Sequence, residues 1–156
     1  MSELGKELAG ELTASGHVLR QRVYFEDTDF TGIVYHARYL HFLERGRTDF
    51  LRLVGIHHAE IDDGLHGEKL AWVVRTMQIQ FLAPARIDDV LEIDTHVATI
   101  SGARIAMGQR IFSRGMLLVE AQVEAAIVNG EGKPRRFPKD WITRFPSAAL
   151  TKITHP

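Results

Sequence analysis

The chain has 156 residues, of which 45% are apolar, and a formal net charge of −1 at pH 7. This length fits one domain with one hydrophobic core, and the charge balance gives no sign of a partner such as nucleic acid or an acidic membrane surface. Cysteine is absent, which excludes disulfides, thiolate metal sites and a cysteine nucleophile.

The N-terminus lacks the apolar stretch of a secretory signal, and no apolar run approaches the ~20 residues of a transmembrane segment. A cytoplasmic location is therefore expected, in agreement with the absence of cysteine. Residues 1–16 show no firm period, which favours a mobile N-terminal extension. One domain is then expected over residues 17–145, followed by a C-terminal tail over residues 146–156.

The first elements in the chain are a predicted strand and a polar loop. Residues 17–25 alternate loosely and are rich in β-forming side chains, which predicts a strand. Residues 26–32 (EDTDFTG) are polar and end in glycine, which predicts a loop.

The period then changes to that of a helix. Apolar residues recur at three- and four-residue steps from Tyr35 to Val54, and Gly55 follows as a stop signal. This pattern predicts an amphipathic helix of about five turns. Gly46 lies on its apolar stripe, where a missing side chain would let the helix approach a sheet closely.

Four further segments alternate between apolar and polar residues, over residues 76–81, 91–97, 103–112 and 117–128. Short connectors with glycine favour antiparallel hairpins, because parallel pairing needs crossover helices for which there is no room. A short helix is expected near Trp141. The element order predicts an α+β domain with an antiparallel sheet and one long helix.

The loop before the helix carries the chemistry. A helix start presents unpaired N–H groups and the positive end of the helix dipole, which can hold an oxyanion. Asp27 and Asp29 lie just upstream, and a carboxylate there can attack a carbonyl or activate water. The alternative is that Asp27, Thr28 and Asp29 only cap the helix or a turn.

Two segments resemble a known family. Residues 23–40 (VYFEDTDFTGIVYHARYL) and 42–48 (FLERGRT) are similar to the signature of the 4-hydroxybenzoyl-CoA thioesterase family, in particular its YbgC-type acyl-CoA thioesterase branch linked to the Tol–Pal system. Residues 81–89 (FLAPARIDD) resemble its second segment. The resemblance spans about residues 17–140 and implies a hotdog fold, an antiparallel sheet wrapped around one long central helix, in homodimers or dimers of dimers (homotetramers).

The resemblance also implies a reaction, the hydrolysis of an acyl-CoA thioester to free acid and CoA, which needs no cofactor. The family's catalytic aspartate, a nucleophile or general base, falls on Asp29, and its oxyanion-polarising backbone amide falls on His36, while Gly32 allows a close turn. Phe30 and Thr31 stand between the aspartate and the glycine, where the family usually has small residues. The acyl group that this chain prefers is therefore expected to differ from that of other family members. The residues expected to contact the acyl group are Phe30, Thr31 and Tyr35.

Other side chains are weaker candidates. CoA phosphates need cations, and the available basic residues are Arg114, Lys133, Arg135 and Arg136, although a basic tail can also be merely solvated. The His36 imidazole, Asp27 and Glu44 are secondary acid–base candidates. The histidines, including the pair at 57–58, lack metal-ligand spacing, so no metal site is expected.

Two other functions stay open. A hotdog dehydratase would act on acyl-carrier-protein substrates, but its His-Phe-Pro-Gly run is missing. A non-catalytic dimeric adaptor would bind an acyl carrier protein or a cell-envelope partner, although the intact loop around Asp29 argues against it. A serine hydrolase or a P-loop phosphatase is disfavoured, because neither motif is present.

Overall fold

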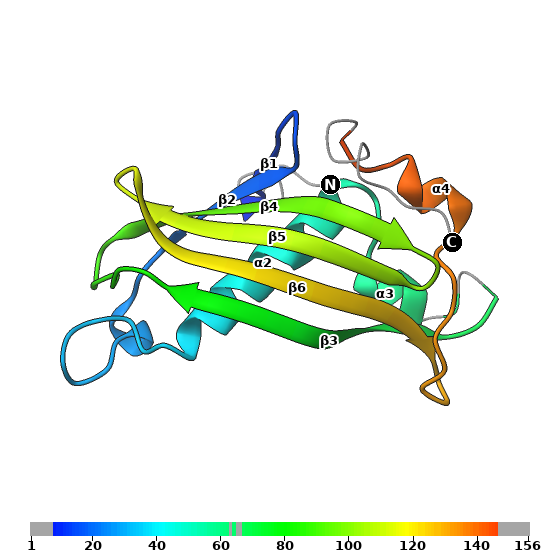
Figure 1. The fold of residues 1–156 in the computed structure, drawn as a ribbon, viewed down its shortest axis with the longest axis horizontal. Coiled ribbons are helices and arrows are strands. Elements are labelled where there is room, and N and C mark those ends of the chain that lie inside the picture. Colours follow the sequence, from blue (N-terminus) through cyan, green and yellow to red (C-terminus); the bar gives the residue numbers. More distant parts are fainter. Residues whose placement is uncertain (1–7, 63, 65–66, 147–156) are drawn as a thin grey trace.

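The computed structural model describes residues 8–62, 64 and 67–146, in which a curled antiparallel sheet packs on one long helix (Figure 1). The strands are β1 (Glu11–Leu12), β2 (His17–Arg22), β3 (Leu70–Phe81), β4 (Val90–Ser101), β5 (Arg104–Ser113) and β6 (Met116–Asn129). The helices are the 3₁₀ turn η1 (Phe25–Asp27), α2 (Arg38–Leu53), α3 (His58–Asp62) and α4 (Lys139–Ile142). Residues 1–7 of the predicted N-terminal extension and residues 147–156 of the predicted C-terminal tail lie outside the described part, as do residues 63 and 65–66.

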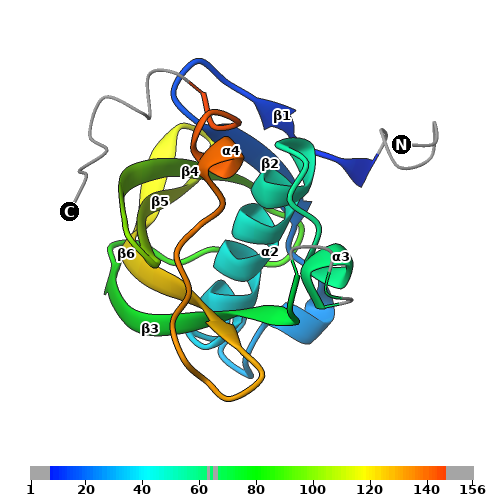
Figure 2. The ribbon, with the colours of Figure 1, turned by 90° about the vertical axis from the view of Figure 1, so that its right-hand side faces the viewer.

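The six strands follow the order β1-β2-β4-β5-β6-β3, and every neighbouring pair is antiparallel. The hairpins β4–β5 and β5–β6 are those predicted from the short connectors. The sheet wraps around α2, which fills its concave side (Figure 2). The predicted hotdog fold is thereby confirmed.

The apolar stripe of α2 forms the centre of the core. Phe42, Leu43 and Phe50 are completely buried. Phe42 and Leu43 belong to a cluster with side chains of β4, β5 and β6, and Phe50 to a second cluster that includes Trp141 of α4. Complete burial of each such side chain stabilises the fold by roughly 1.5–3 kcal/mol, so the helix and the sheet depend on each other.

At Gly46, α2 packs closely against β4 of the sheet. A Cβ atom at this position would lie 2.8 Å from Ile93 Cγ2 and 3.2 Å from Thr95 Oγ1. We expect Gly46→Leu to lower the free energy of unfolding by about 2 kcal/mol or more, because the core is already filled. Arg45→Leu, at the exposed neighbouring position, should change it by less than about 0.5 kcal/mol. Urea denaturation of both variants measures the difference, and equal stability would contradict the close packing.

Several element boundaries differ from the prediction: the first strand ends at Arg22 rather than Phe25, which begins η1, and α3 was not predicted. Helix α2 starts at Arg38, three residues later than Tyr35, because the Tyr35 N–H donates to the Asp27 carbonyl and residues 35–37 form a turn. Strand β3 starts at Leu70, six residues before the alternating segment, since a register shift between Val74 and Thr76 interrupts the alternation. Strand β1 is too short for a pattern to predict.

The segment before β2 is attached to α2 by a buried polar contact. Asp49 Oδ2 accepts hydrogen bonds from the Gly10 N–H at 2.8 Å and from His17 Nε2 at 2.6 Å. His17 is buried and stacks on Phe50 with a centroid distance of 5.4 Å. Burial lowers the pKa of His17 below its ordinary 6.5, against the opposing effects of Asp49 and Asp94. The folded protein therefore favours the neutral imidazole.

This preference makes stability depend on pH. As the pH falls below 6.5, the unfolded chain takes up a proton at His17 before the folded chain does, so the free energy of unfolding decreases. We expect the wild type to lose more stability between about pH 7 and about pH 5.5 than His17→Gln does. The exposed His41→Gln should behave like the wild type. Urea titrations at both pH values measure this, and equal pH slopes in all three proteins would contradict the effect of burial.

Candidate active site

A narrow loop between η1 and α2 holds Asp29. The loop is closed by an isolated β-bridge between Thr28 and Val34 and by the Asp29 N–H, which donates to the Ile33 carbonyl at 2.9 Å. Gly32 has a φ of 89°, in the left-handed region that favours glycine, and its N–H donates to the Asp29 carbonyl at 3.1 Å. The expected close turn at Gly32 is therefore present, and the backbone around Asp29 is fixed.

The Asp29 carboxylate is partly exposed and is held by Thr31. Its Oδ1 accepts from the Thr31 hydroxyl at 2.5 Å and from the Thr31 N–H at 2.8 Å. The hydroxyl donor, with help from neighbouring backbone N–H groups, keeps the pKa of Asp29 below its ordinary 3.8. The carboxylate is therefore ionised at neutral pH, and the two hydrogen bonds from Thr31 fix its orientation.

His36 lies in the turn before α2 and not inside the helix, which corrects its predicted place in the first helical turn. Within the described residues, the backbone N–H groups of His36 and Ala37 meet no hydrogen-bond acceptor. They lie at the positive end of a 16-residue helix. Two free donors thus stand seven and eight residues after Asp29, beyond a loop that folds back on itself.

Asp27, two residues before Asp29, has a structural role. Asp27 is buried, its Oδ2 accepts from the Tyr24 N–H at 2.8 Å, and its Oδ1 lies 3.3 Å from Arg38 Nε. The Thr28 hydroxyl donates to the Phe25 carbonyl. No side chain caps α2, so the alternative that these residues cap the helix is wrong. The other form of that alternative, that they cap a turn, is confirmed for Asp27 and Thr28, which stabilise the 3₁₀ turn.

An apolar groove lies beside His36. It has a volume of about 310 Å³. The rings of His36 and Phe81 lie 6.3 Å apart, and the Tyr39 hydroxyl accepts from the Ala85 N–H at 3.1 Å. Of the residues around this groove, His36 was predicted as a site residue from the sequence, whereas Tyr39 and Phe81 were not, although the second family segment begins at Phe81. The lining residues are Ile33, Val34, His36, Tyr39, Phe81, Leu82, Ala83 and Pro84.

The residues expected to contact the acyl group lie around the loop. Phe30 is fully exposed, and its ring makes no aromatic contact in the described chain. Tyr35 is 48% exposed and packs edge-on against His36 at a centroid distance of 4.7 Å. Thr31 instead faces Asp29 through both of its donors. Phe30 and Tyr35 are thus available to a ligand or to another chain.

The predicted basic cluster does not exist within one chain. Arg114 lies in the β5–β6 hairpin and pairs with Asp89 at 3.8 Å. Lys133, Arg135 and Arg136 follow the other end of β6, where Arg135 pairs with Glu68 at 2.6 Å. Strand β6 has 14 residues and therefore separates the two ends by about 45 Å. From the sequence alone, these four residues were grouped because the tail, which carries three of them, could not be assigned a position in the fold.

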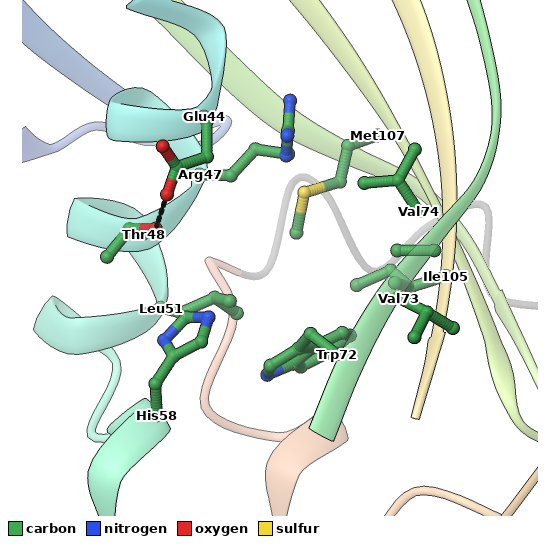
Figure 3. Close-up of a pocket in the computed structure, with 11 residues that line it drawn as sticks. Glu44, Arg47, Thr48, Leu51, His58, Trp72, Val73, Val74, Ile105 and Met107 are labelled. Atoms are coloured by element: carbon green, nitrogen blue, oxygen red, sulfur yellow. Dashed lines mark hydrogen bonds between the residues drawn. The ribbon is translucent and has the colours of Figure 1, made fainter. Parts of the chain in front are cut away.

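A second cavity lies between α2 and β3 (Figure 3). It has a volume of about 250 Å³, and the polar residues on its wall are Glu44, Arg47, Thr48, His58 and Trp72. Arg47 is nine residues into α2, so the cavity lies about 13 Å along the helix from the loop of Asp29. From the sequence, Glu44 was only a secondary acid–base candidate and Arg47 had no assigned role, so this cavity was not predicted.

Metal and membrane features are not found in the part of the chain that the structure describes. No three His, Asp or Glu side chains there gather as metal ligands would. Among the same residues, no helix is both long and apolar enough to cross a bilayer.

Comparisons with known proteins agree with this geometry. Residues 23–145 match the family described as the thioesterase-like superfamily. The acyl-CoA thioesterase YbgC of Haemophilus influenzae is 43% identical over 80% of this chain and 90% of its own length. The acyl-CoA thioester hydrolase YbgC of Escherichia coli O6:H1 is 44% identical over 80% and 91%.

A comparison with solved structures indicates the same family. The crystal structure of a probable thioesterase from Bartonella henselae superposes with a TM-score of 0.78 and 51% identity, over 80% of this chain and all of that one. The family match over residues 23–145 covers the loop of Asp29, α2 and strands β3 to β6. The chain belongs to the thioesterase-like superfamily and, within it, to the YbgC acyl-CoA thioesterases.

Proposed function

We propose that this protein hydrolyses acyl-CoA thioesters to the free acid and CoA, with Asp29 as the reacting carboxylate. The observation that carries the proposal is an ionised carboxylate held on a tight turn just before two unpaired N–H groups at the start of α2. The YbgC relatives, which are named for this activity, support it. No cofactor is required, because the charge is stabilised by backbone donors.

The reaction follows from these groups. The thioester carbonyl oxygen accepts from the N–H of His36, which stabilises the negative charge that develops on that oxygen. Asp29 either attacks the carbonyl carbon, giving an anhydride that water then cleaves, or takes a proton from a water that attacks directly. In both routes the C–S bond breaks, CoA leaves as a thiol, and water supplies the oxygen of the acid.

We further propose that the site is completed by a second copy of the chain, paired through β3. Strand β3 is one edge of the described sheet, has 12 residues, and exposes Val73 (38%) and Val74 (51%). An exposed edge of this length and apolarity is a template for another strand. The other edge, β1, has only two residues. Two-fold antiparallel pairing of β3 would give the homodimer expected from the family resemblance.

This pairing brings the two halves of a site together. Phe81, at one end of β3, lies next to His36 and Tyr39. Trp72 and Val74, near the other end, line the cavity on α2. A two-fold axis at the middle of β3 sets the Phe81 end of one chain against the Trp72 end of the other. The cavity of one chain would then receive the acyl group whose thioester lies at Asp29 of its partner.

The same axis offers a CoA site. It would bring the tail of the partner, with its Lys133, Arg135 and Arg136, toward the end of the sheet that carries Arg114 and Asp29. The two basic groups, which are apart in one chain, would then face one CoA molecule, whose phosphates need such cations. Phe30 and Tyr35 would cover the acyl end of the thioester.

A panel of acyl-CoA esters with detection of free thiol tests the proposed function. We expect release of CoA that depends on the acyl group. An acyl-carrier-protein thioester in the same assay tests whether the carrier must be CoA. No thiol release from any ester, by a protein shown to be folded and dimeric, would contradict the proposal and favour the adaptor alternative.

A further inference from the structure

The cavity between α2 and β3, here called the Arg47 pocket, contains more hydrogen-bond donors than acceptors. Its walls are otherwise apolar, formed by Leu51, Val73, Val74, Ile105, Met107 and Ala125. In Figure 3 the side chain of Arg47 extends from α2 across this space, toward Met107 and Val74. Polar groups inside an apolar pocket fix the orientation and identity of a ligand.

Arg47 is held in place, but most of its hydrogen-bond donors are unused among the described residues. Its Nη1 donates to Gln109 Oε1 at 2.9 Å. The Gln109 side chain is itself buried, and its Nε2 donates to the Leu43 carbonyl and to Thr95 Oγ1, both at 2.9 Å. A guanidinium has five N–H donors, and in the described chain only this one bond uses them. The cation is thus rigidly positioned with donors to spare.

Trp72 supplies a second unused donor. Its Nε1 is buried and has no hydrogen-bond partner among the described residues. The indole is fixed by stacking on Trp141 at 6.0 Å and by contact with Phe137 at 5.5 Å. A buried N–H without an acceptor is costly. A group that enters the pocket with an oxygen acceptor would remove that cost.

The charge around the pocket favours a neutral acceptor. Glu44 lies on the same wall, where its Oε1 accepts from the Thr48 hydroxyl at 3.4 Å, and offsets the charge of Arg47. Burial lowers the pKa of His58, so this imidazole is neutral at pH 7. A second carboxylate from a ligand would face Glu44, whereas a hydroxyl or oxo group would not be repelled.

From these contacts we infer that the Arg47 pocket selects acyl groups that carry a hydroxyl or oxo oxygen near their distal end, which Arg47 and Trp72 bind. This inference rests on the proposed function and names its substrate class. The pocket volume of about 250 Å³ lies just below the range of about 300–1,000 Å³ that is typical of small-molecule sites. The acyl group is therefore of medium length at most.

The test compares kcat/KM for hexanoyl-CoA, 5-oxohexanoyl-CoA, 6-hydroxyhexanoyl-CoA and adipyl-CoA. The wild type should prefer the better of the two neutral oxygenated esters over hexanoyl-CoA by about 10- to 100-fold, the range of one hydrogen bond to a charged group. Arg47→Met should abolish this preference, and Trp72→Phe, which keeps the aromatic packing, should reduce it about fivefold. Arg45→Met, at an exposed position of the same helix, should keep it.

The ratio between esters is the decisive readout, because a merely structural defect would lower all rates together. Equal rates on the oxygenated and plain esters by the wild type, or an unchanged ratio in folded Arg47→Met, would overturn the inference and leave the thioesterase proposal intact. A preference for adipyl-CoA would overturn the choice of a neutral group. If Arg47→Met does not fold, the ratio in Trp72→Phe decides. No hydrolysis of any ester would reject the proposed function itself.

Discussion

Replacing Asp29 by asparagine is expected to lower kcat for acyl-CoA hydrolysis by at least about 1,000-fold, because the carboxylate is the group that attacks or activates water. The loss of one oxyanion donor costs less, about 3 kcal/mol in the transition state. The fold should be unaffected, since an asparagine Oδ1 still accepts from the Thr31 N–H and hydroxyl. Thiol release and a thermal melt of the same sample measure both effects.

Glu26→Gln is the matched control. It makes the same change of charge three residues earlier, at an exposed side chain of the same loop. It should leave kcat within about twofold of the wild type, as expected of a surface substitution. A folded Asp29→Asn protein with full activity would exclude Asp29 from the reaction. Equal losses in both variants would instead assign the effect to the charge of the loop.

The local parts of the fold were predictable because each leaves a pattern in the sequence. The apolar stripe from Tyr35 to Val54 predicted a helix with one buried face, which forms from Arg38 onward. The glycine connectors predicted the β4–β5 and β5–β6 hairpins. Gly32 and Gly46 were predicted where a turn and a close approach need them, and both features are present. The turn at Gly32 depends on residues close together in the chain, whereas the close approach at Gly46 also depends on Ile93 and Thr95 of β4.

The site was harder to predict than the fold, because most of its residues come from segments that are far apart in the sequence. The place of Phe81 beside His36 and of Trp72 opposite Arg47 depends on the position of β3 at the sheet edge, which no local pattern fixes. The start of α2 moved because the Asp27 carbonyl accepts from the Tyr35 N–H, a bond that residue spacing does not predict. Asp29 was named through family resemblance, while spacing alone left capping as an alternative.

If each active site is built from two chains, two different inactive variants should complement each other in a mixed dimer. A site built within one chain would not allow this. Ala125→Phe should fill the Arg47 pocket, which Ala125 lines, and abolish hydrolysis with its own Asp29 intact. Asp29→Asn should be inactive with its own pocket intact. In a mixed dimer of the two, one site carries both defects, and the other combines the intact Asp29 of one chain with the open pocket of its partner.

Co-expression of the two variants in equal amounts should therefore restore activity. Random pairing makes half of the dimers mixed, each with one working site of two, so about a quarter of the wild-type kcat is expected per chain. Each variant alone provides the baseline, and size-exclusion chromatography shows that all three samples are dimers. If the dimeric mixture is no more active than the variants alone, Asp29 acts on a substrate bound within its own chain, and pairing through β3 does not build the site.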